Sequence, residues 1–229
     1  MITDPPILRI RRNFPRPSPE IVAALTGVAT GHLVDAMGGS GALDWRIKPL
    51  DNATPGFCGV AMTCDAGPAD NMAVFGALDA AKPGDVIIAA TGGHLAAAVI
   101  GDLIVGMARN CDVTAIVTEG TVRDAAGILA VGLPVYCAGV SPNSPVRNGP
   151  GTVGLPIVVG GVAVESGDIL VGDRDGVVVV PRQMAAKVAA KLVEVRAAEA
   201  ALEAKIKAGL RIPEFVAALL KSNRIDEIS

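Results

Sequence analysis

The order of elements in the middle of the chain constrains the fold most. Residues 86–90 (Val-Ile-Ile-Ala-Ala) form a short apolar run directly after the turn Lys-Pro-Gly-Asp at 82–85. Residues 102–110 have the composition of a mostly apolar helix, and a β-branched run follows at 113–118. A strand–helix–strand order places the two strands in parallel in one sheet. The sequence therefore predicts an α/β fold.

The rest of the chain adds short strands and a few helices. Residues 1–17, rich in Arg and Pro, are expected to form an irregular arm, and the longest helix is expected at 183–208. Turn residues recur about every eight positions between the later apolar runs, which indicates a compact β-rich core and not a regular doubly wound sheet. We expect one domain, residues 1–229, with a C-terminal helical extension at 183–229. Other helices are expected from Ser18 and at 30–37, 70–81 and 213–220, and other strands at 57–63, 133–138, 155–159, 162–164, 169–172 and 177–180.

Composition limits the partners that the chain can have. The net charge is −3 and there is no basic block, so nucleic acid is not an expected partner. Only 19% of the residues are charged and the mean hydropathy is positive, which indicates apolar surface covered by other copies of the chain. Four scattered Cys and two His give no zinc pattern. The uncharged stretch at 125–146 is interrupted by Gly and Pro, and no signal-peptide pattern opens the sequence. We expect a cytoplasmic homo-oligomer that does not enter a membrane.

Two acids and an arginine stand beside the predicted strands. Asp102 follows Gly101 at the start of the apolar helix, where as an N-cap it would leave the next backbone N–H groups free for an anion. Arg123 and Asp124 lie past the carboxyl end of the strand at 113–118, where α/β folds usually bind ligands. Two carboxylates, a guanidinium and a helix N-terminus suit a divalent metal ion and a small carboxylate substrate. A local ion pair and a plain helix cap account for the same spacing, so the pattern alone leaves both interpretations open.

The longest predicted helix carries a carboxylate in its apolar stripe. Glu199 takes the stripe position between Val195 and Leu202. A carboxylate is costly to bury without a partner, so this position favours a functional role. If the helix projects beyond its own core, however, Glu199 is simply solvated. The pattern supports the two interpretations equally.

Four motifs, in this order along the chain, resemble the RraA-like family. They are Leu33-Val34-Asp35-Ala36, Gly101-Asp102-Leu103, Gly120-x-Val-Arg123-Asp124 and Gly172-Asp173-x-Asp175-Gly176-Val177. The resemblance covers about residues 18–210. That family contains class II pyruvate aldolases for 4-hydroxy-4-methyl-2-oxoglutarate and 4-carboxy-4-hydroxy-2-oxoadipate, and also the ribonuclease E regulator RraA. The resemblance implies a swivelling β/β/α fold with N-terminal helices and a long C-terminal helix, assembled as a trimer or hexamer with active sites between subunits.

The resemblance to the aldolases also implies a role for each candidate residue. Mg²⁺ or Mn²⁺ would be held by Asp124 directly and by Asp102 through water, and the 2-oxo acid substrate would chelate it. Arg123 would stabilise the enolate, and the backbone at Gly101 and of Leu103 and Ile104 would hold the substrate carboxylate. The catalytic set would be completed by Glu199, contributed by a neighbouring subunit.

One position departs from the aldolase pattern. The aldolases usually carry Arg-Asp-x-x-Glu/Asp, and here the last position is Gly127. Oxaloacetate decarboxylation needs the same enolate and metal with less substrate recognition, so it depends less on this position. The sequence therefore predicts a metal-dependent carbon–carbon lyase that releases pyruvate, with decarboxylase activity. The alternative is an RraA-type regulator that binds ribonuclease E without catalysis, although a binding protein has no need for this set of charged side chains.

Overall fold

The centre of the fold is a parallel sheet, seen here in a computed structural model that describes residues 6–228. Its strands are β3 (Phe57–Asp65), β4 (Asp85–Ala90), β6 (Ala115–Thr118) and β8 (Val135–Cys137), in that spatial order. The predicted parallel pair is confirmed, because β4 and β6 run in register from Val86↔Ala115 to Ala89↔Thr118. All six residues of β4 are buried, as expected for an apolar run in the middle of a parallel sheet.

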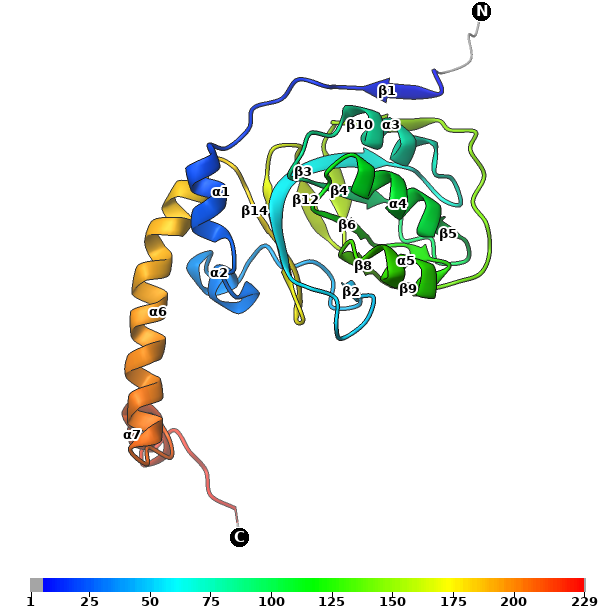
Figure 1. Cartoon of the computed structure of the whole chain (residues 1–229). Coiled ribbons are helices and arrows are strands. Elements are labelled where there is room, and N and C mark those ends of the chain that lie inside the picture. The colour runs from blue at the N-terminus through cyan, green and yellow to red at the C-terminus, as the bar shows by residue number, and fades with distance from the viewer. Residues whose placement is uncertain (1–5, 229) are drawn as a thin grey trace, which may run out of the picture.

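Further strands extend this sheet at both sides. β2 (Lys48–Pro49) lies antiparallel to β8, and β10 (Gly151–Val153) lies antiparallel to the end of β3. The predicted irregular arm is wrong at one place, because Leu8–Ile10 form the edge strand β1, parallel to β10. The start of β3 pairs instead with β13 (Ile169–Asp173), which is followed by its antiparallel partner β14 (Gly176–Val180). β3 therefore has different neighbours at its two ends, and Figure 1 shows it as a long curved strand.

The two faces of the sheet are covered by different layers. The helices α3 (Met72–Ala80), α4 (Asp102–Asn110) and α5 (Ala125–Val131) share one apolar core with one face (Figure 1). The hairpin of β11 (Ile157–Val159) and β12 (Val162–Val164) contributes to a second core on the other face. The expected β/β/α arrangement is confirmed. The helix α5 was not predicted as a separate element.

A third core joins the N-terminal and C-terminal helices. The helices α1 (Pro19–Leu25), α2 (Thr30–Ala36) and α6 (Ala185–Lys207) pack their apolar residues against β13 and β14. Asp173, at the end of β13, accepts hydrogen bonds from the backbone N–H and the hydroxyl of Thr30, both at 2.8 Å. The first bond satisfies an orphan backbone donor at the start of α2, and both bonds fix the helix to the sheet.

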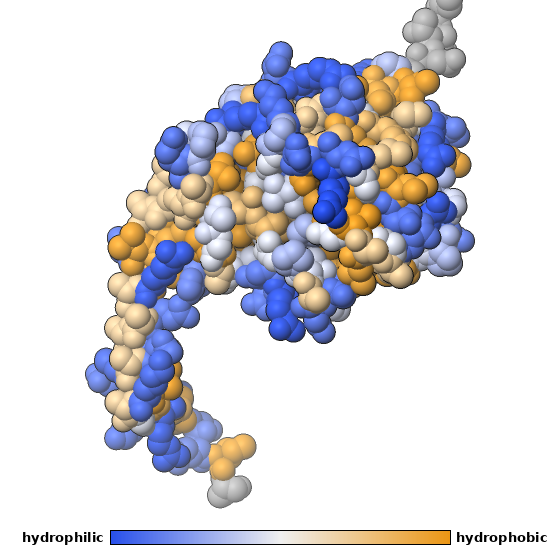
Figure 2. Space-filling view, viewed as in Figure 1, coloured by the Kyte–Doolittle hydropathy of each residue, from blue (hydrophilic) through white to orange (hydrophobic). Residues whose placement is uncertain are grey.

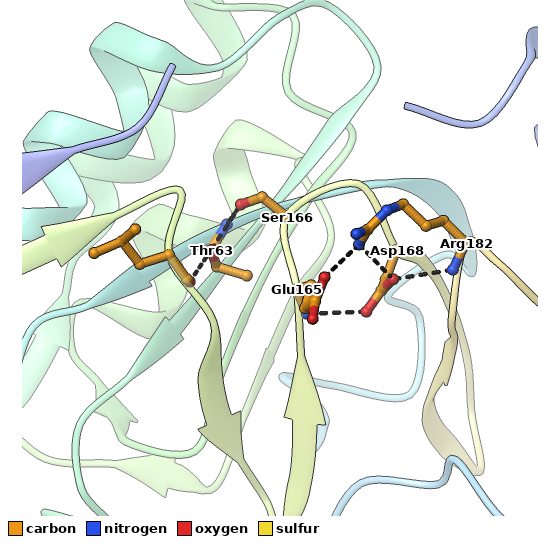
Figure 3. A network of polar contacts seen from close by, with 6 residues as sticks. Thr63, Glu165, Ser166, Asp168 and Arg182 are labelled. Atoms are coloured by element: carbon orange, nitrogen blue, oxygen red, sulfur yellow. Dashed lines mark hydrogen bonds and ion pairs between the residues drawn. The ribbon is translucent and has the colours of Figure 1, made fainter. Parts of the chain in front are cut away.

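A polar network fixes the chain just before α6 (Figure 3). The buried Asp168 accepts a hydrogen bond from the backbone N–H of Arg182 at 3.0 Å and from that of Glu165 at 2.9 Å. The guanidinium of Arg182 lies 2.7 Å from the Glu165 carboxylate. Beside it, Ser166 accepts a hydrogen bond from the backbone N–H of Thr63, which ties this turn to β3. The direction in which α6 leaves the core is thus set by buried hydrogen bonds.

The last part of the chain projects away from the body of the protein (Figure 1). Val188 and Leu192 of α6 are buried, but every α6 residue from position 196 onward is exposed. The short helix α7 (Glu214–Leu220) contains no buried residue. Figure 2 shows apolar residues along this projection between hydrophilic ones. None of the helices within residues 6–228 is long and apolar enough to cross a membrane.

Candidate functional site

The candidate site lies where three parallel strands end. After β4, β6 and β8 the chain continues into β5 (Ala98–Ile100), β7 (Thr121–Val122) and β9 (Gly139–Val140), which pair in parallel as a small second sheet. The helices α4 and α5 begin directly after β5 and β7. The carboxyl edge of the sheet therefore presents two adjacent helix N-termini, a usual place for anionic ligands in α/β folds.

Asp102 opens α4, but not as the predicted cap. Gly101 occupies the N-cap position, and Asp102 is the first helical residue. The Asp102 Oδ1 atom accepts a hydrogen bond from the backbone N–H of Leu103 at 2.8 Å. The N-cap prediction for Asp102 is therefore wrong by one residue, because Gly101 has the extended backbone that a cap requires. The carboxylate still lies in the first turn, where negative charge is favourable.

Arg123 and Asp124 lie between β7 and α5. Asp124 has a left-handed backbone, with φ of 57°, which Asp and Asn adopt more readily than most residues. The Arg123 Nε atom is 3.2 Å from Asp124 Oδ2, and its Nη1 donates to the Ser144 hydroxyl at 2.5 Å. Asp124 and Ser144 together orient the guanidinium of Arg123. The Arg123 side chain is 34% exposed and that of Asp124 is 48% exposed, so both remain accessible to a ligand.

Two glycines allow the two carboxylates to approach the opposite helix start. A Cβ atom added at Gly101 would lie 2.8 Å from Asp124 Oδ2. A Cβ atom added at Gly127 would lie 2.5 Å from Asp102 Oδ2 and 2.7 Å from the Asp102 Cβ. A side chain at Gly101 would displace the Asp124 carboxylate, and one at Gly127 would also press on the Asp102 Cβ, which cannot move without its helix. Gly127 therefore makes room for Asp102. Where the Arg-Asp-x-x-Glu/Asp pattern has a carboxylate on α5, this chain has a glycine, and the Asp102 carboxylate of α4 lies against it.

The donor set suits one class of metal ion. Within residues 6–228, no group of three or more His, Cys, Asp or Glu side chains is arranged to hold a metal. A closed structural site, which needs about four protein ligands, is therefore not formed. Mg²⁺ keeps several water ligands and binds through one or two carboxylates together with its substrate. Asp102 and Asp124 fit that requirement.

The backbone groups expected to bind the substrate carboxylate have partners within the chain. The N–H of Leu103 donates to the Asp102 carboxylate, and the N–H of Ile104 donates to the Gly101 carbonyl at 3.1 Å. A substrate carboxylate that replaced the first bond would require the Asp102 side chain to rotate. The predicted anion site at α4 is therefore closed by Asp102 in this structure.

Glu199 lies away from these residues in its own chain. Its carboxylate contacts the Nε2 atom of His32 on α2, and its side chain is 61% exposed. In Figure 1 the helices α2 and α6 are at the other end of the molecule from α4 and α5. One copy of the chain therefore does not bring Glu199 together with Asp102, Arg123 and Asp124, so its role still rests on a neighbouring copy.

A cavity of about 160 Å³ opens at the same edge of the sheet, on the side of the β11–β12 hairpin. Glu119 lines it and is held by the backbone N–H groups of Thr91, Gly93 and Gly160, at 2.9–3.2 Å. Hydrogen bonds from Arg46 lower the pKa of Asp44, also in the lining, to about 2. None of the predicted site residues lines this cavity.

Ser144 was missed by sequence reasoning. It lies on the loop that precedes β10 and contacts Arg123 across a sequence separation of 21 residues. A serine in a loop rich in proline and glycine carries no signal of such a contact. In one chain Glu199 is exposed on a projecting helix, as the second interpretation of the apolar stripe expected, and the stripe did not indicate the partner His32.

The fold and site define a three-layer β/β/α protein with a carboxylate–arginine site at the carboxyl edge of its parallel sheet. The chain belongs to the RraA-like family, whose family model, described as Aldolase/RraA, matches residues 30–179. It is 34% identical over 163 residues to a protein of Halalkalibacterium halodurans named "Putative 4-hydroxy-4-methyl-2-oxoglutarate aldolase". That match covers 71% of this chain and 77% of the relative.

Solved structures share the same fold. An uncharacterized protein from Pseudomonas syringae pv. tomato superposes with a TM-score of 0.74 at 25% identity, over 86% of this chain and 96% of its own. RraAS2 of Streptomyces coelicolor, described as an unusual member of the RNase ES inhibitor RraA family, has a TM-score of 0.73 at 26% identity. This match covers 83% of this chain and 100% of RraAS2. The family thus includes relatives named for two different functions.

Proposed function

We propose that this protein is a divalent-metal-dependent lyase that releases pyruvate from 4-hydroxy-2-oxo diacids and also decarboxylates oxaloacetate. The observation that carries the proposal is the mutual fit of Asp102 and Gly127, beside Arg123 and Asp124. The glycine in α5 leaves room for the Asp102 carboxylate of α4 between the two helix starts. Glycine in a helix is unfavourable by about 1 kcal/mol relative to alanine, so the arrangement is maintained against helix propensity. The relative named as an aldolase supports the same reaction.

In this proposal the side chains divide the reaction between them. The bond between C3 and C4 of the substrate breaks, and its electron pair passes to the enolate of pyruvate. The C4 hydroxyl loses its proton, and C4 becomes a carbonyl carbon. Arg123 stabilises the charge that develops on the enolate oxygen. The Asp102 carboxylate and Glu199 from a second copy would move the protons, and a proton returned to C3 completes pyruvate.

A metal ion at Asp124 and Asp102 would supply Lewis-acid stabilisation of the 2-oxo group. The choice between Mg²⁺ and Mn²⁺ is open in this proposal, because both are bound by carboxylate and water oxygens.

The alternative is a regulator that binds an RNA-processing enzyme, supported by the likeness to RraAS2. Such a protein would share the fold but would not use the site at the sheet edge. A carboxylate pair beside an oriented arginine therefore favours the lyase.

The test is pyruvate release from 4-hydroxy-4-methyl-2-oxoglutarate, 4-carboxy-4-hydroxy-2-oxoadipate and oxaloacetate. Each substrate is assayed with Mg²⁺, with Mn²⁺ and with excess chelator, and the rate due to metal alone is subtracted. Chelator-sensitive release from the hydroxy acids and from oxaloacetate is expected. Release from oxaloacetate alone would reduce the function to decarboxylation, and no release by a folded protein would favour the regulator.

We propose further that the active unit is a homo-oligomer, a trimer or hexamer, in which α6 of one copy brings Glu199 to the sheet edge of another. Support comes from the exposed apolar residues of the projecting segment, which lack cover in one chain. Leu202 is 43% exposed, Ile206 55% and Phe215 74%. Exposed apolar surface of this kind is typical of an interface.

A mixing experiment tests this assembly. Arg123→Ala and Glu199→Gln are each expected to lower turnover strongly. If the two side chains of one site come from different copies, oligomers mixed at random regain roughly a quarter of the wild-type activity, because one site in four receives both intact side chains. No recovery on mixing, with exchange of subunits verified by differently tagged copies, would contradict a site shared between copies.

A further inference from the structure

The guanidinium of Arg123 makes one hydrogen bond within residues 6–228, and its partner is Ser144. The Nη1 atom donates to the Ser144 hydroxyl at 2.5 Å. The contact of Nε with Asp124, at 3.2 Å, is an ion pair. In the proposed lyase Asp124 is also the metal ligand, so Ser144 is the partner whose hydroxyl serves the guanidinium alone.

The rest of the Arg123 side chain is confined by the start of α4. The backbone N–H of Arg123 donates to the carbonyl of Ile100 at 3.0 Å. A Cβ atom added at Gly101 would lie 3.2 Å from the Arg123 Cγ atom and 3.3 Å from its Nε atom, so the side chain lies directly over this glycine. The freedom that remains is rotation about the outer bonds of the side chain, and the hydrogen bond to Ser144 fixes that rotation.

Ser144 itself is held by anchors on both sides of it in the loop, although it is exposed. One residue earlier, the side chain of Asn143 donates to the carbonyl of Ala96 at 2.7 Å. Two residues later, the backbone N–H of Val146 donates to the carbonyl of Ala69 at 2.8 Å. A hydroxyl on a stretch anchored this closely is a fixed acceptor, as a group that orients a functional side chain must be.

These contacts leave one nitrogen of Arg123 for a ligand. The Nη2 atom makes no hydrogen bond within residues 6–228 and is not buried. The guanidinium is planar, and its three nitrogens surround one carbon atom. Fixing Nε and Nη1 therefore fixes the direction of Nη2 as well, and Ser144 sets the direction in which Arg123 donates to a ligand.

We propose that Ser144 is a positioning residue, which holds Arg123 so that Nη2 donates to the oxygen on which the enolate charge develops. This inference rests on the proposed lyase function. A donor that is fixed in advance needs no reorganisation when the charge develops, so it lowers the barrier without strengthening the binding of the substrate. The enolate is common to cleavage of the hydroxy acids and decarboxylation of oxaloacetate, so Ser144 acts equally on both reactions.

The test compares Ser144→Ala with wild type on 4-hydroxy-4-methyl-2-oxoglutarate and on oxaloacetate. We expect kcat to fall roughly tenfold on both, with KM unchanged to within about twofold. Ser144→Thr keeps the hydroxyl, and the extended backbone favoured before Pro145 suits a β-branched side chain, so this variant should restore most of kcat. Ser141→Ala is the control, because its hydroxyl donates to the carbonyl of Ala96 in the same loop, and kcat should stay within about twofold of wild type.

A second background separates positioning from a purely structural role. Arg123→Lys keeps the positive charge but lacks the Nη1 atom that Ser144 holds. When Ser144→Ala is added to Arg123→Lys, kcat should fall by less than about twofold, because the two substitutions remove the same interaction. A structural role of Ser144 would instead give the same loss in both backgrounds.

Each other outcome has a distinct meaning. Wild-type kcat in Ser144→Ala, or a loss that persists in the Arg123→Lys background, would overturn the inference and leave the proposed function standing. A loss confined to KM, or to the hydroxy acid, would make Ser144 a substrate-binding group and overturn the inference as well. Wild-type protein that turns over neither acid would overturn the proposed function, and this inference with it.

Discussion

The sheet edge and the projecting end of α6 hold their charged residues in opposite ways. At the edge, Asp102 and Asp124 lie against the glycines of the two helix starts, and a Cβ atom at Gly127 would overlap the Asp102 side chain. On α6, Glu199 is 61% exposed, and its carboxylate contacts His32. The side chains at the edge are therefore positioned by contacts within one chain, whereas those at the end of α6 are largely exposed.

This difference shows how the proposed site divides its tasks. Charges that hold a metal and an enolate need fixed positions, and short helices anchored by buried strands supply them. A group on a projecting helix is fixed only when something covers that helix. The apolar residues near Glu199 are thus expected to become ordered when copies of the chain assemble. Substitutions at the sheet edge and on α6 test the two regions separately.

Asp124→Asn should have the largest effect. Asparagine keeps the shape and tolerates the left-handed backbone, so the fold is retained while the charge is lost. We expect turnover of oxaloacetate with Mg²⁺ to fall at least about a hundredfold, as for loss of a metal ligand. Asp112→Asn is a matched control, because Asp112 is exposed and also has a left-handed φ, of 54°. Nearly full activity in Asp124→Asn would show that the metal binds elsewhere.

Gly127→Ala should have an intermediate effect. The new methyl group must displace the Asp102 side chain, and the contact with the Asp102 Cβ means that α4 or α5 must also shift. We expect turnover to fall roughly tenfold, since small displacements in a preorganised site are costly. The control is Gly106→Ala in α4, which has nothing within 4 Å and should add about 0.5–1 kcal/mol of stability without loss of activity. If Gly127→Ala were as active as the Gly106→Ala control, the position of Asp102 would not matter for the reaction.

Local patterns predicted most of the fold. Alternation and β-branched runs located β4, β6, β13 and β14, and the long apolar stripe located α6. The short helix α5 was not found as a separate element, because Ala-Ala-Gly-Ile-Leu-Ala-Val has no polar face and contains a glycine. Its position depends on packing against α4 and the sheet, which periodicity does not describe.

The candidate site was predictable only where its residues lie at the end of a recognisable strand or at the start of a recognisable helix. Arg123 and Asp124 follow a recognisable strand, and Asp102 begins a recognisable helix. Ser144 joins the same region through a loop whose later part is fixed by Asp70. The contact between Gly127 and Asp102 also depends on how two helices pack, so the sequence showed it only as a departure from a pattern.

Leu202→Ala should have the smallest effect on the stability of a single chain. It is compared with Leu192→Ala, at a buried position of the same helix. Leu192 is 2% exposed in its own core, so Leu192→Ala should lower the unfolding free energy by about 2–5 kcal/mol. Leu202 is 43% exposed, and in a single chain its truncation should change stability by less than about 0.5 kcal/mol. If a second copy covers Leu202, the variant should instead dissociate at a higher protein concentration than wild type. Light scattering across a dilution series, with urea unfolding of each variant, measures both quantities. A Leu202→Ala variant with the assembly and dissociation of wild type would mean that this face of α6 remains exposed, and Glu199 would then lack the contact that brings it to a neighbouring site.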